Sequence, residues 1–342
     1  MPISRRLTLA AVLLFLSVLV LYLPTLRGGF VYDSIAQVLY SDYIHTSANW
    51  VDVLTLRVVG QDQLDRNRQL FLASLMLDAA IWKREPFGYR LTSVLLHALN
   101  ASLLFLFIAI ALRGRTPPVA AASSPSVVPL SAAFSALVFA LHPLVVEAVA
   151  EPSNREDLLV LLPMLVGLIC LAAPLPSRTA LNAVLILCSF FAALAKESGI
   201  AVPFVFAGAG WLSGHFRRSL PGLLAGLLAA IGFLVASYIW RPSGSAIFVN
   251  SPQPLADNFW TISGVQLRIW TLQFWQIVWP WNLSAHYTAD AIGGITIPLA
   301  IAVVAVVVAV AVLVWRVDRL AALGVAVYAL CLLPASNFAA QY

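Results

Sequence analysis

The chain has 342 residues, of which 61% are hydrophobic and only 10% are charged, and its formal net charge is +5. Soluble domains contain roughly 45–50% apolar and about 25% charged residues, so this composition excludes a soluble globular fold. It predicts an integral membrane protein with an all-α fold, a polytopic transmembrane helical bundle that forms a single domain over residues 1–342. The basic residues form no stripe of the kind that binds nucleic acid.

Apolar runs mark the expected membrane spans, because a helix needs about 20 mostly apolar residues to cross a bilayer. The first run follows Arg5 and Arg6 and lacks a small-residue cleavage site, so we expect a retained helix rather than a secretory signal peptide. Shorter runs that are weaker candidates lie at 180–194, 199–212 and 320–334. Runs of sufficient length lie at 7–26, 88–112, 130–150, 158–173, 220–240 and 295–314.

The basic residues predict which side of the membrane each loop faces, because cytoplasmic loops carry an excess of Lys and Arg. With the N-terminus in the cytoplasm, the inner segments contain many arginines and a single acid, Asp318, whereas acids are in excess on the outer side. We therefore predict a cytoplasmic N-terminus and an acidic extracytoplasmic face. The inner basic residues are Arg5, Arg6, Arg113, Arg115, Arg178, Arg217, Arg218, Arg316 and Arg319.

Two long segments are expected on the extracytoplasmic side. The first extracytoplasmic loop covers 27–87, and within it residues 70–82 are too short for a comfortable span and carry Asp78, so a helix along the membrane is expected. The second loop covers 241–294. Its segment 260–281 contains five tryptophans and an arginine, which suits the headgroup level, and predicts an interfacial or re-entrant helix.

Carboxylates near the outer ends of the helices are the first candidate functional residues. Asp33 follows the first helix at the membrane surface, where it is either a solvated loop acid or a carboxylate that reaches lipid and water together. Further along, Glu147 and Glu151 are four residues apart and are expected to share a helix face. Their like charges need a nearby cation, and Arg155 is the expected partner, either at a functional site or in a purely structural ion pair.

Cations on the same side complete the candidate site. Lys196-Glu197 interrupts two short apolar runs, where Lys196 could hold a phosphate or could merely contact lipid headgroups. Arg68, Arg90, Arg241 and His286 are weaker candidates of the same kind. Carboxylates and cations that face one compartment suit a reaction in which a carboxylate deprotonates an acceptor and cations hold a lipid phosphate leaving group.

At these residues the sequence resembles the TMTC-type O-mannosyltransferases and their bacterial relatives, within the GT-C class of membrane glycosyltransferases. The matching stretches follow the family's order over nearly the whole chain. They are GGFVYDSIAQV (28–38), NRQLFLASLMLDAAIW (67–82), PFGYRLTSVLLHALNASLLF (86–105), ALVFALHPLVVEAVAEPSNREDLL (136–159), LAKESGIAVP (194–203), NLSAHYTADAI (282–292) and LLPASNF (332–338).

The resemblance implies an enzyme that transfers a hexose, with mannose as the candidate, from a polyprenyl-phosphate carrier to a protein or glycan acceptor. Transfer would invert the sugar's anomeric configuration on the extracytoplasmic side of a bacterial inner membrane, or of the endoplasmic reticulum in a eukaryote. A divalent cation is compatible with the acids but is not required by them. The catalytic residues it implies are Asp33, Glu147 and Asp157. The substrate-binding residues are Arg68, His142, Arg155, Lys196, Glu197 and His286.

The chain departs from this family at two places. Members usually have two adjacent acids after the first helix, whereas this chain has Asp33-Ser34, which predicts that one carboxylate suffices or that activity is lower. After Ala340-Gln341-Tyr342 the usual tetratricopeptide repeats are absent, as expected for a truncated or divergent member. Two other readings are a transporter or flippase of a lipid-linked sugar, and an inactive membrane scaffold derived from such enzymes.

Overall fold

The structure is a computed structural model that describes residues 4–114, 127–173, 175–240, 259–281, 283–284 and 290–335. All regular structure in these ranges is helical, which confirms the predicted all-α helical bundle. The chain divides into two compact units, residues 1–243 and 244–342. The single domain over 1–342 stays a prediction, as does the membrane side of the segments 27–87 and 241–294.

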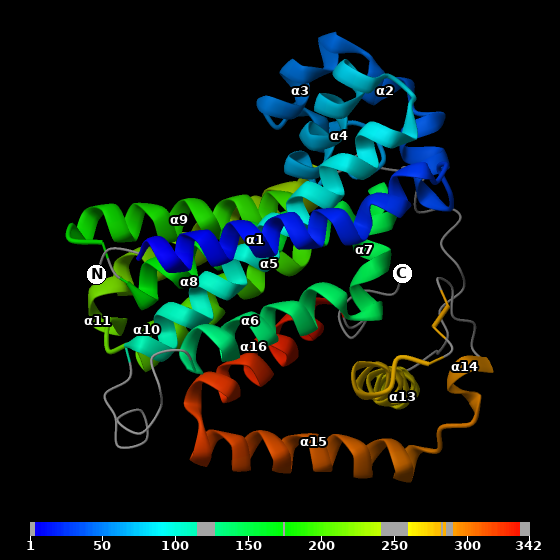
Figure 1. Ribbon diagram of the computed structural model, residues 1–342. Helices are drawn as coiled ribbons and strands as arrows, with labels where there is room; N and C mark the ends of the chain where they lie inside the picture. The colour runs from blue at the N-terminus through cyan, green and yellow to red at the C-terminus, as the bar shows by residue number, and fades with distance from the viewer. Residues whose placement is uncertain are drawn as a thin grey trace. The chain divides into compact units, whose positions relative to one another are not determined.

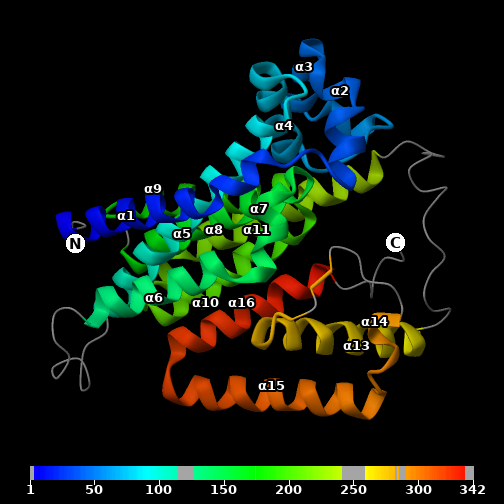
Figure 2. The same cartoon turned by 45° about the vertical axis from the view of Figure 1, so that its right-hand side comes forward.

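The first unit is a bundle of long helices with a group of short helices at one end (Figures 1 and 2). The short helices belong to the loop that follows the first long helix, and they are α2 (Asp42–His45), α3 (Trp50–Leu54) and α4 (Gln69–Trp82). The bundle itself consists of α1 (Arg5–Tyr22), α5 (Pro86–Arg113), α6 (Val127–Leu141), α7 (Val146–Ala150), α8 (Arg155–Ala172), α9 (Arg178–Ala195), α10 (Val202–Leu212) and α11 (Phe216–Ile239).

Several helices are long and apolar enough to cross a membrane. Four of these helices match predicted spans. A fifth covers the run at 180–194, which the sequence analysis gave as a weaker candidate. The helix α8, expected as a span at 158–173, is not among them, because its first turn carries Arg155, Glu156 and Asp157. The candidate spans are Arg5–Arg27, Pro86–Arg113, Arg178–Ala195, Phe216–Ile239 and Ile297–Val317.

The run at 130–150, expected as one continuous span, is a pair of helices bent by 53°. Pro143 lacks a backbone N–H, so the helix cannot continue through it. The side chain of His142 accepts a hydrogen bond from the backbone N–H of Leu144 (3.3 Å) and caps the new turn. The backbone oxygen of Ala140 is then bound by the Tyr22 hydroxyl (3.0 Å), so the break is stabilised by neighbouring helices.

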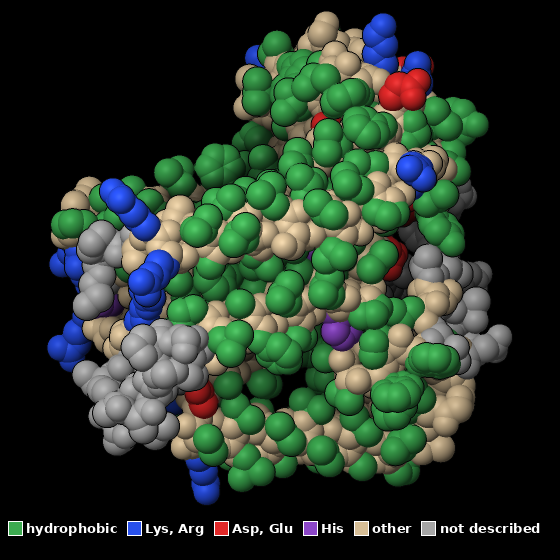
Figure 3. Space-filling view, in the orientation of Figure 1, with side chains coloured by type: hydrophobic (Ala, Val, Ile, Leu, Met, Phe, Trp, Pro, Cys, Tyr) green, Lys and Arg blue, Asp and Glu red, His purple; other side chains and the backbone are tan. Residues whose placement is uncertain are grey.

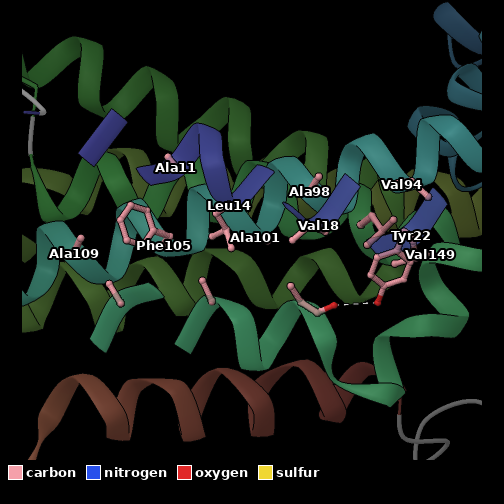
Figure 4. Close-up of a cluster of buried hydrophobic side chains, with 14 of the residues drawn as sticks. Ala11, Leu14, Val18, Tyr22, Val94, Ala98, Ala101, Phe105, Ala109 and Val149 are labelled. Carbon is pink, nitrogen blue, oxygen red and sulfur yellow. Dashed lines mark hydrogen bonds between the residues drawn. The ribbon is translucent and has the colours of Figure 1, made fainter. Parts of the chain in front are cut away.

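The core of this bundle lies where α1, α5 and α6 meet (Figure 4). On α1 the buried residues repeat every three or four positions, as expected for one helix face, and small alanines on α5 and α6 let the backbones approach closely. Tyr22 lies beside Val94 in Figure 4, and the Ser102 hydroxyl on α5 donates to the backbone oxygen of Ala11 on α1 (3.0 Å), so α1 and α5 run antiparallel. The start of α1 and the end of α5 therefore share one end of the bundle.

That end of the bundle is basic. The turn between α8 and α9 meets the turn between α10 and α11, where Arg218 donates to the backbone oxygens of Leu175 and Pro176. In Figure 3, Lys and Arg atoms gather at the end where α1 begins, and hydrophobic side chains cover the flank of the bundle. The arginines predicted to lie on one side of the membrane therefore gather at one end of this unit. The basic side chains at this end are Arg5, Arg6, Arg113, Arg178, Arg217 and Arg218.

The second unit contains α13 (Phe259–Val278), α14 (Asp290–Gly293), α15 (Ile297–Val317) and α16 (Arg319–Ala335). The segment predicted to be an interfacial helix is α13, so its helical state is confirmed, while its position in the membrane stays a prediction. The carboxylate of Asp318 accepts from the backbone N–H groups of Leu320 (2.8 Å) and Ala321 (3.0 Å) and caps α16.

Candidate functional site

The turn that carries Asp33 is fixed from within the first loop and from α7. Tyr32 has a positive φ of 48°, which turns the chain sharply just before the exposed Asp33. Ser34 is fully buried, and its hydroxyl donates to the backbone oxygen of Val31 (2.7 Å). The Ser34 backbone N–H donates to the Glu151 carboxylate (3.2 Å). Ser34 stands where the similar family usually has a second acid, and it holds Glu151, an acid from a distant stretch of the sequence, beside Asp33.

Arg90 ties this loop to the bundle. It lies near the start of α5 and is almost completely buried. Its guanidinium donates to the backbone oxygens of Gly29 in the loop and Ala150 at the end of α7. The loop that carries Asp33 is therefore held to two helices of the bundle by one side chain.

A cluster of ion pairs lies around Arg68, directly before α4. Its Nη1 atom is 3.1 Å from the Asp65 carboxylate and 2.7 Å from the Glu156 carboxylate. Its other edge, Nε and Nη2, contacts both oxygens of Glu197 at 3.2–3.3 Å. Arg68 therefore joins the first loop to the first turn of α8 and to the segment that follows α9.

Lys196 completes this cluster, which we call the ion-pair cluster: Asp65, Arg68, Glu156, Asp157, Lys196 and Glu197. The Lys196 ammonium group is 2.9 Å from Glu156 and 2.7 Å from Asp157. Burial alone would lower the pKa of Lys196, but the charges and hydrogen bonds of Asp157 and Glu156 outweigh burial and raise its pKa. Lys196 is therefore held in its charged form.

The local fold places Lys196 and Glu197 at the end of α9. Lys196 has an extended backbone (φ −161°, ψ 153°) that ends the helix, and a single 3-10 turn, Glu197–Ala201, leads into α10. Gly199 lies against the end of α9, where an added Cβ atom would be 2.1 Å from the backbone oxygen of Ala192. A residue without a side chain is needed there for the turn to pack against the helix.

Asp33 lies within electrostatic range of the ion-pair cluster. Burial raises the pKa of Asp65, Arg68 opposes this increase, and the charges of Glu197 and Asp33 add to it. Asp33 is therefore close enough to Asp65 for the two carboxylates to repel each other. The prediction that acids from distant stretches meet at one end of the bundle holds for these residues, while their catalytic and binding roles stay predictions.

Glu147 and His142 lie on the bent segment that leads to α8. Glu147 is exposed and accepts a hydrogen bond from the Asn154 side chain (3.2 Å), and the charges of Asp157 and Lys196 reach it. His142 is half-buried and caps the turn described above. Among the predicted site residues, His286 and the weaker candidate Arg241 lie outside the described residues.

The expected pairing of Arg155 with Glu147 and Glu151 is wrong. Arg155 is 0% exposed, and its Nη2 atom is 2.6 Å from Asp78 on α4, which is 3% exposed. Its remaining donors bind the Ser93 hydroxyl (3.1 Å) and backbone or hydroxyl oxygens of α4 and α5. Arg155 therefore points into the bundle and links α4, α5 and α8.

The sequence pattern gave Glu156 and Asp65 no role at the site, although both contact the predicted site residue Arg68. Glu156 is adjacent in sequence to the predicted catalytic residue Asp157, and only the fold shows that Glu156 contacts both Arg68 and Lys196. Within the described residues, no group of three or more His, Cys, Asp or Glu side chains is arranged to hold a metal ion.

The sequence has a distant similarity to a known protein. The chain is 26% identical over 305 residues to Protein O-mannosyl-transferase Tmtc1 from Drosophila melanogaster. The match covers 81% of this chain and 34% of that protein, so the chain spans about a third of the length of the relative. No protein-family model and no solved structure matches the chain. Together with the apolar helices, the similarity supports an integral membrane protein related to TMTC-type glycosyltransferases.

Proposed function

We propose that this protein is a membrane glycosyltransferase of the GT-C class that moves a sugar from a polyprenyl-phosphate carrier to a protein or glycan acceptor. Mannose is the candidate sugar, because the relative is an O-mannosyl-transferase. The observation that carries the proposal is the arrangement at the end of the first unit opposite its basic end. There an exposed carboxylate, Asp33, lies within electrostatic range of a cluster that contains Arg68 and Lys196.

The chemistry requires an acid–base group and a stabilised leaving group. The acceptor oxygen attacks the anomeric carbon, and the acceptor proton passes to the Asp33 carboxylate, which acts as general base. The bond between the anomeric carbon and the phosphate oxygen breaks, and its electrons stay on the polyprenyl phosphate. Arg68 and Lys196 stabilise the negative charge that develops on that phosphate. One displacement of this kind inverts the anomeric configuration.

The surroundings of Asp33 suit a lipid-linked donor. Val31 and Tyr32 expose 42% and 65% of their surface beside it, so apolar side chains flank the carboxylate. A prenyl chain can pack on such side chains while the phosphate and sugar reach the polar cluster. Glu147 and Asp157 remain proposed to help in acid–base chemistry and His142 to help in binding, as the family resemblance implies, whereas the burial of Arg155 against Asp78 assigns it a structural role.

The test compares Asp33→Ala with Asp42→Ala, a matched change of an exposed acid in the same loop. Purified protein in lipid nanodiscs receives a labelled mannosyl-phosphoryl polyprenol and a pool of Ser- and Thr-containing peptides. Labelled peptide and released polyprenyl phosphate are then measured. Loss of a general base lowers the rate by about 10²–10⁴-fold, so Asp33→Ala should nearly abolish both signals and Asp42→Ala should keep them.

Undiminished transfer by Asp33→Ala would defeat the assignment of Asp33. If the wild-type protein moves the labelled lipid across a proteoliposome membrane and forms no glycosyl product, it is a transporter and the proposed function fails. Binding of the donor lipid without turnover would instead identify an inactive scaffold.

A further inference from the structure

We propose that Glu156 is a positioning residue that holds Arg68 and Lys196 side by side, and that the carrier phosphate binds these cations by displacing Glu197 and Asp157. This inference rests on the proposed function and adds a division of labour among the four carboxylates of the ion-pair cluster. Asp65 and Glu156 stay in place, whereas Glu197 and Asp157 occupy the positions that the phosphate takes.

The first step is the geometry of Glu156. Its Oε2 atom lies 2.7 Å from the Arg68 guanidinium, and its Oε1 atom lies 2.9 Å from the Lys196 ammonium. The cations come from segments far apart in sequence, one before α4 and one after α9, and Glu156 comes from α8. Two cations repel each other, so a carboxylate with one oxygen on each is needed to keep them adjacent.

The second step is the difference in exposure among the partners. The Glu156 side chain is only 6% exposed, whereas Glu197 is 41% exposed and Asp157 is 51% exposed. Ion pairs at exposed positions contribute little to stability, so their carboxylates can exchange with another anion. A buried carboxylate cannot leave its cations without leaving charges unpaired in the interior. Glu156 is therefore the fixed partner, and Glu197 and Asp157 are the exchangeable ones.

The third step is the edge of Arg68 that each acid occupies. Glu156 and Asp65 both contact Nη1, whereas Glu197 spans the Nε and Nη2 atoms with both of its oxygens. That two-donor edge fits a phosphate as well as a carboxylate, because both present paired oxygens to a planar guanidinium. The diester phosphate of the donor, or the monoester that transfer releases, can therefore replace Glu197 on Arg68 without disturbing the contact with Glu156.

Displacement also reduces the electrostatic cost of binding an anion. In the resting cluster the acids Asp65, Glu156, Asp157 and Glu197 outnumber the cations Arg68 and Lys196. Movement of the exposed Glu197 and Asp157 into water takes two negative charges away from the incoming phosphate. The remaining cluster pairs two cations with two buried or half-buried acids, and it can accept the phosphate with less repulsion.

The experiment measures binding of farnesyl phosphate, a short polyprenyl phosphate, to the full chain in detergent by isothermal titration calorimetry, with inorganic phosphate as a second probe. Glu156→Gln should weaken binding of farnesyl phosphate by about tenfold or more, since charge-assisted contacts to misplaced cations are lost. If Glu156 acted only through its negative charge, Glu156→Gln would instead tighten binding of farnesyl phosphate, because the substitution removes a negative charge beside the anion.

The exchangeable acids are tested separately. Glu197→Gln and Asp157→Asn should each tighten binding by about two- to fivefold, the range expected when a competing exposed ion pair is weakened. Asp42→Asn, which alters an exposed pair elsewhere in the first loop, should leave binding unchanged. Equal effects on inorganic phosphate and farnesyl phosphate identify a phosphate site, and tighter binding of farnesyl phosphate identifies a site for the lipid.

Each outcome has a distinct meaning. No binding of farnesyl phosphate by the wild-type protein counts against the proposed function itself. Wild-type binding that Glu156→Gln leaves equal or tighter overturns the inference and leaves the proposed function standing. If Glu156→Gln does not fold, the variants of the exchangeable acids still test the inference. Binding of farnesyl phosphate that is unchanged or weaker in both Glu197→Gln and Asp157→Asn contradicts displacement of these acids by the phosphate.

Discussion

Asp78→Asn removes the carboxylate that pairs with the buried guanidinium of Arg155. The two side chains are 3% and 0% exposed, and their charged atoms are 2.6 Å apart. Removal of one partner of a buried ion pair costs about 3–5 kcal/mol, because the remaining charge is left in the interior. Arg155 keeps its hydrogen bonds to Ser93 and the Tyr89 backbone, so we expect a loss of about 3 kcal/mol in the free energy of unfolding.

The matched control is Asp42→Asn. Asp42 pairs with Arg84 at 2.7 Å, nearly the same distance, but these side chains are 93% and 46% exposed. Exposed ion pairs contribute about 0–1 kcal/mol, so this substitution should change the unfolding free energy by less than about 1 kcal/mol. The comparison separates the effect of burial from that of distance.

Both variants can be unfolded in mixed micelles by titration with a denaturing detergent, with helicity followed by circular dichroism. The double substitution Asp78→Leu with Arg155→Met replaces both partners by apolar groups and should destabilise the protein less than Asp78→Asn alone. Equal losses for Asp78→Asn and Asp42→Asn, or a double variant that is less stable than Asp78→Asn, would refute the reasoning from burial.

Three further substitutions test other parts of the first unit. Gly199→Ala should displace the turn after α9 and lower sugar transfer, whereas Gly232→Ala, whose added Cβ meets nothing within 4 Å, should keep transfer at the wild-type level. Tyr22→Phe should lower the unfolding free energy by about 1 kcal/mol, because the Ala140 carbonyl at the end of α6 loses the hydrogen bond from the Tyr22 hydroxyl and keeps only the contact with His97. Lys196 has a raised pKa, so its stabilising effect should be complete below about pH 10.4 and decline above it; the stability difference between wild type and Lys196→Met should shrink there.

Sequence predicted the helices well and their continuity less well. Long apolar runs fix the existence of a helix, since a bilayer offers no water to unpaired backbone groups. The run at 130–150 contains Pro143, which ends α6 and produces the 53° bend, so the run is not one continuous helix. A count of apolar residues treats such a run as one span, whereas the backbone hydrogen bonds that proline removes decide where the helix stops.

The partner of Arg155 shows why the site was harder to predict than the fold. The argument for Glu147, Glu151 and Arg155 assumed one continuous helix with neighbours four residues apart. In the structure α7 ends at Ala150 and α8 begins at Arg155, with Pro152 between them, so the three side chains leave in different directions. Asp78 is distant from Arg155 in sequence. It belongs to a segment that was expected to lie along the membrane surface, where an acid needs no buried partner.

The environments of the cations decide which of them can bind a phosphate. Arg155 has no exposed surface, and Asp78 neutralises its charge. To bind a lipid phosphate, Arg155 would have to break its ion pair with the buried Asp78 carboxylate. The free energy lost in this way exceeds the free energy gained from a contact with a phosphate at the solvent-exposed surface. Arg68 and Lys196 keep about a quarter of their side chains exposed, and each has one exposed carboxylate that can yield to another anion. Burial therefore favours Arg68 and Lys196 over Arg155 as phosphate ligands and gives Arg155 the task of holding α4, α5 and α8 together.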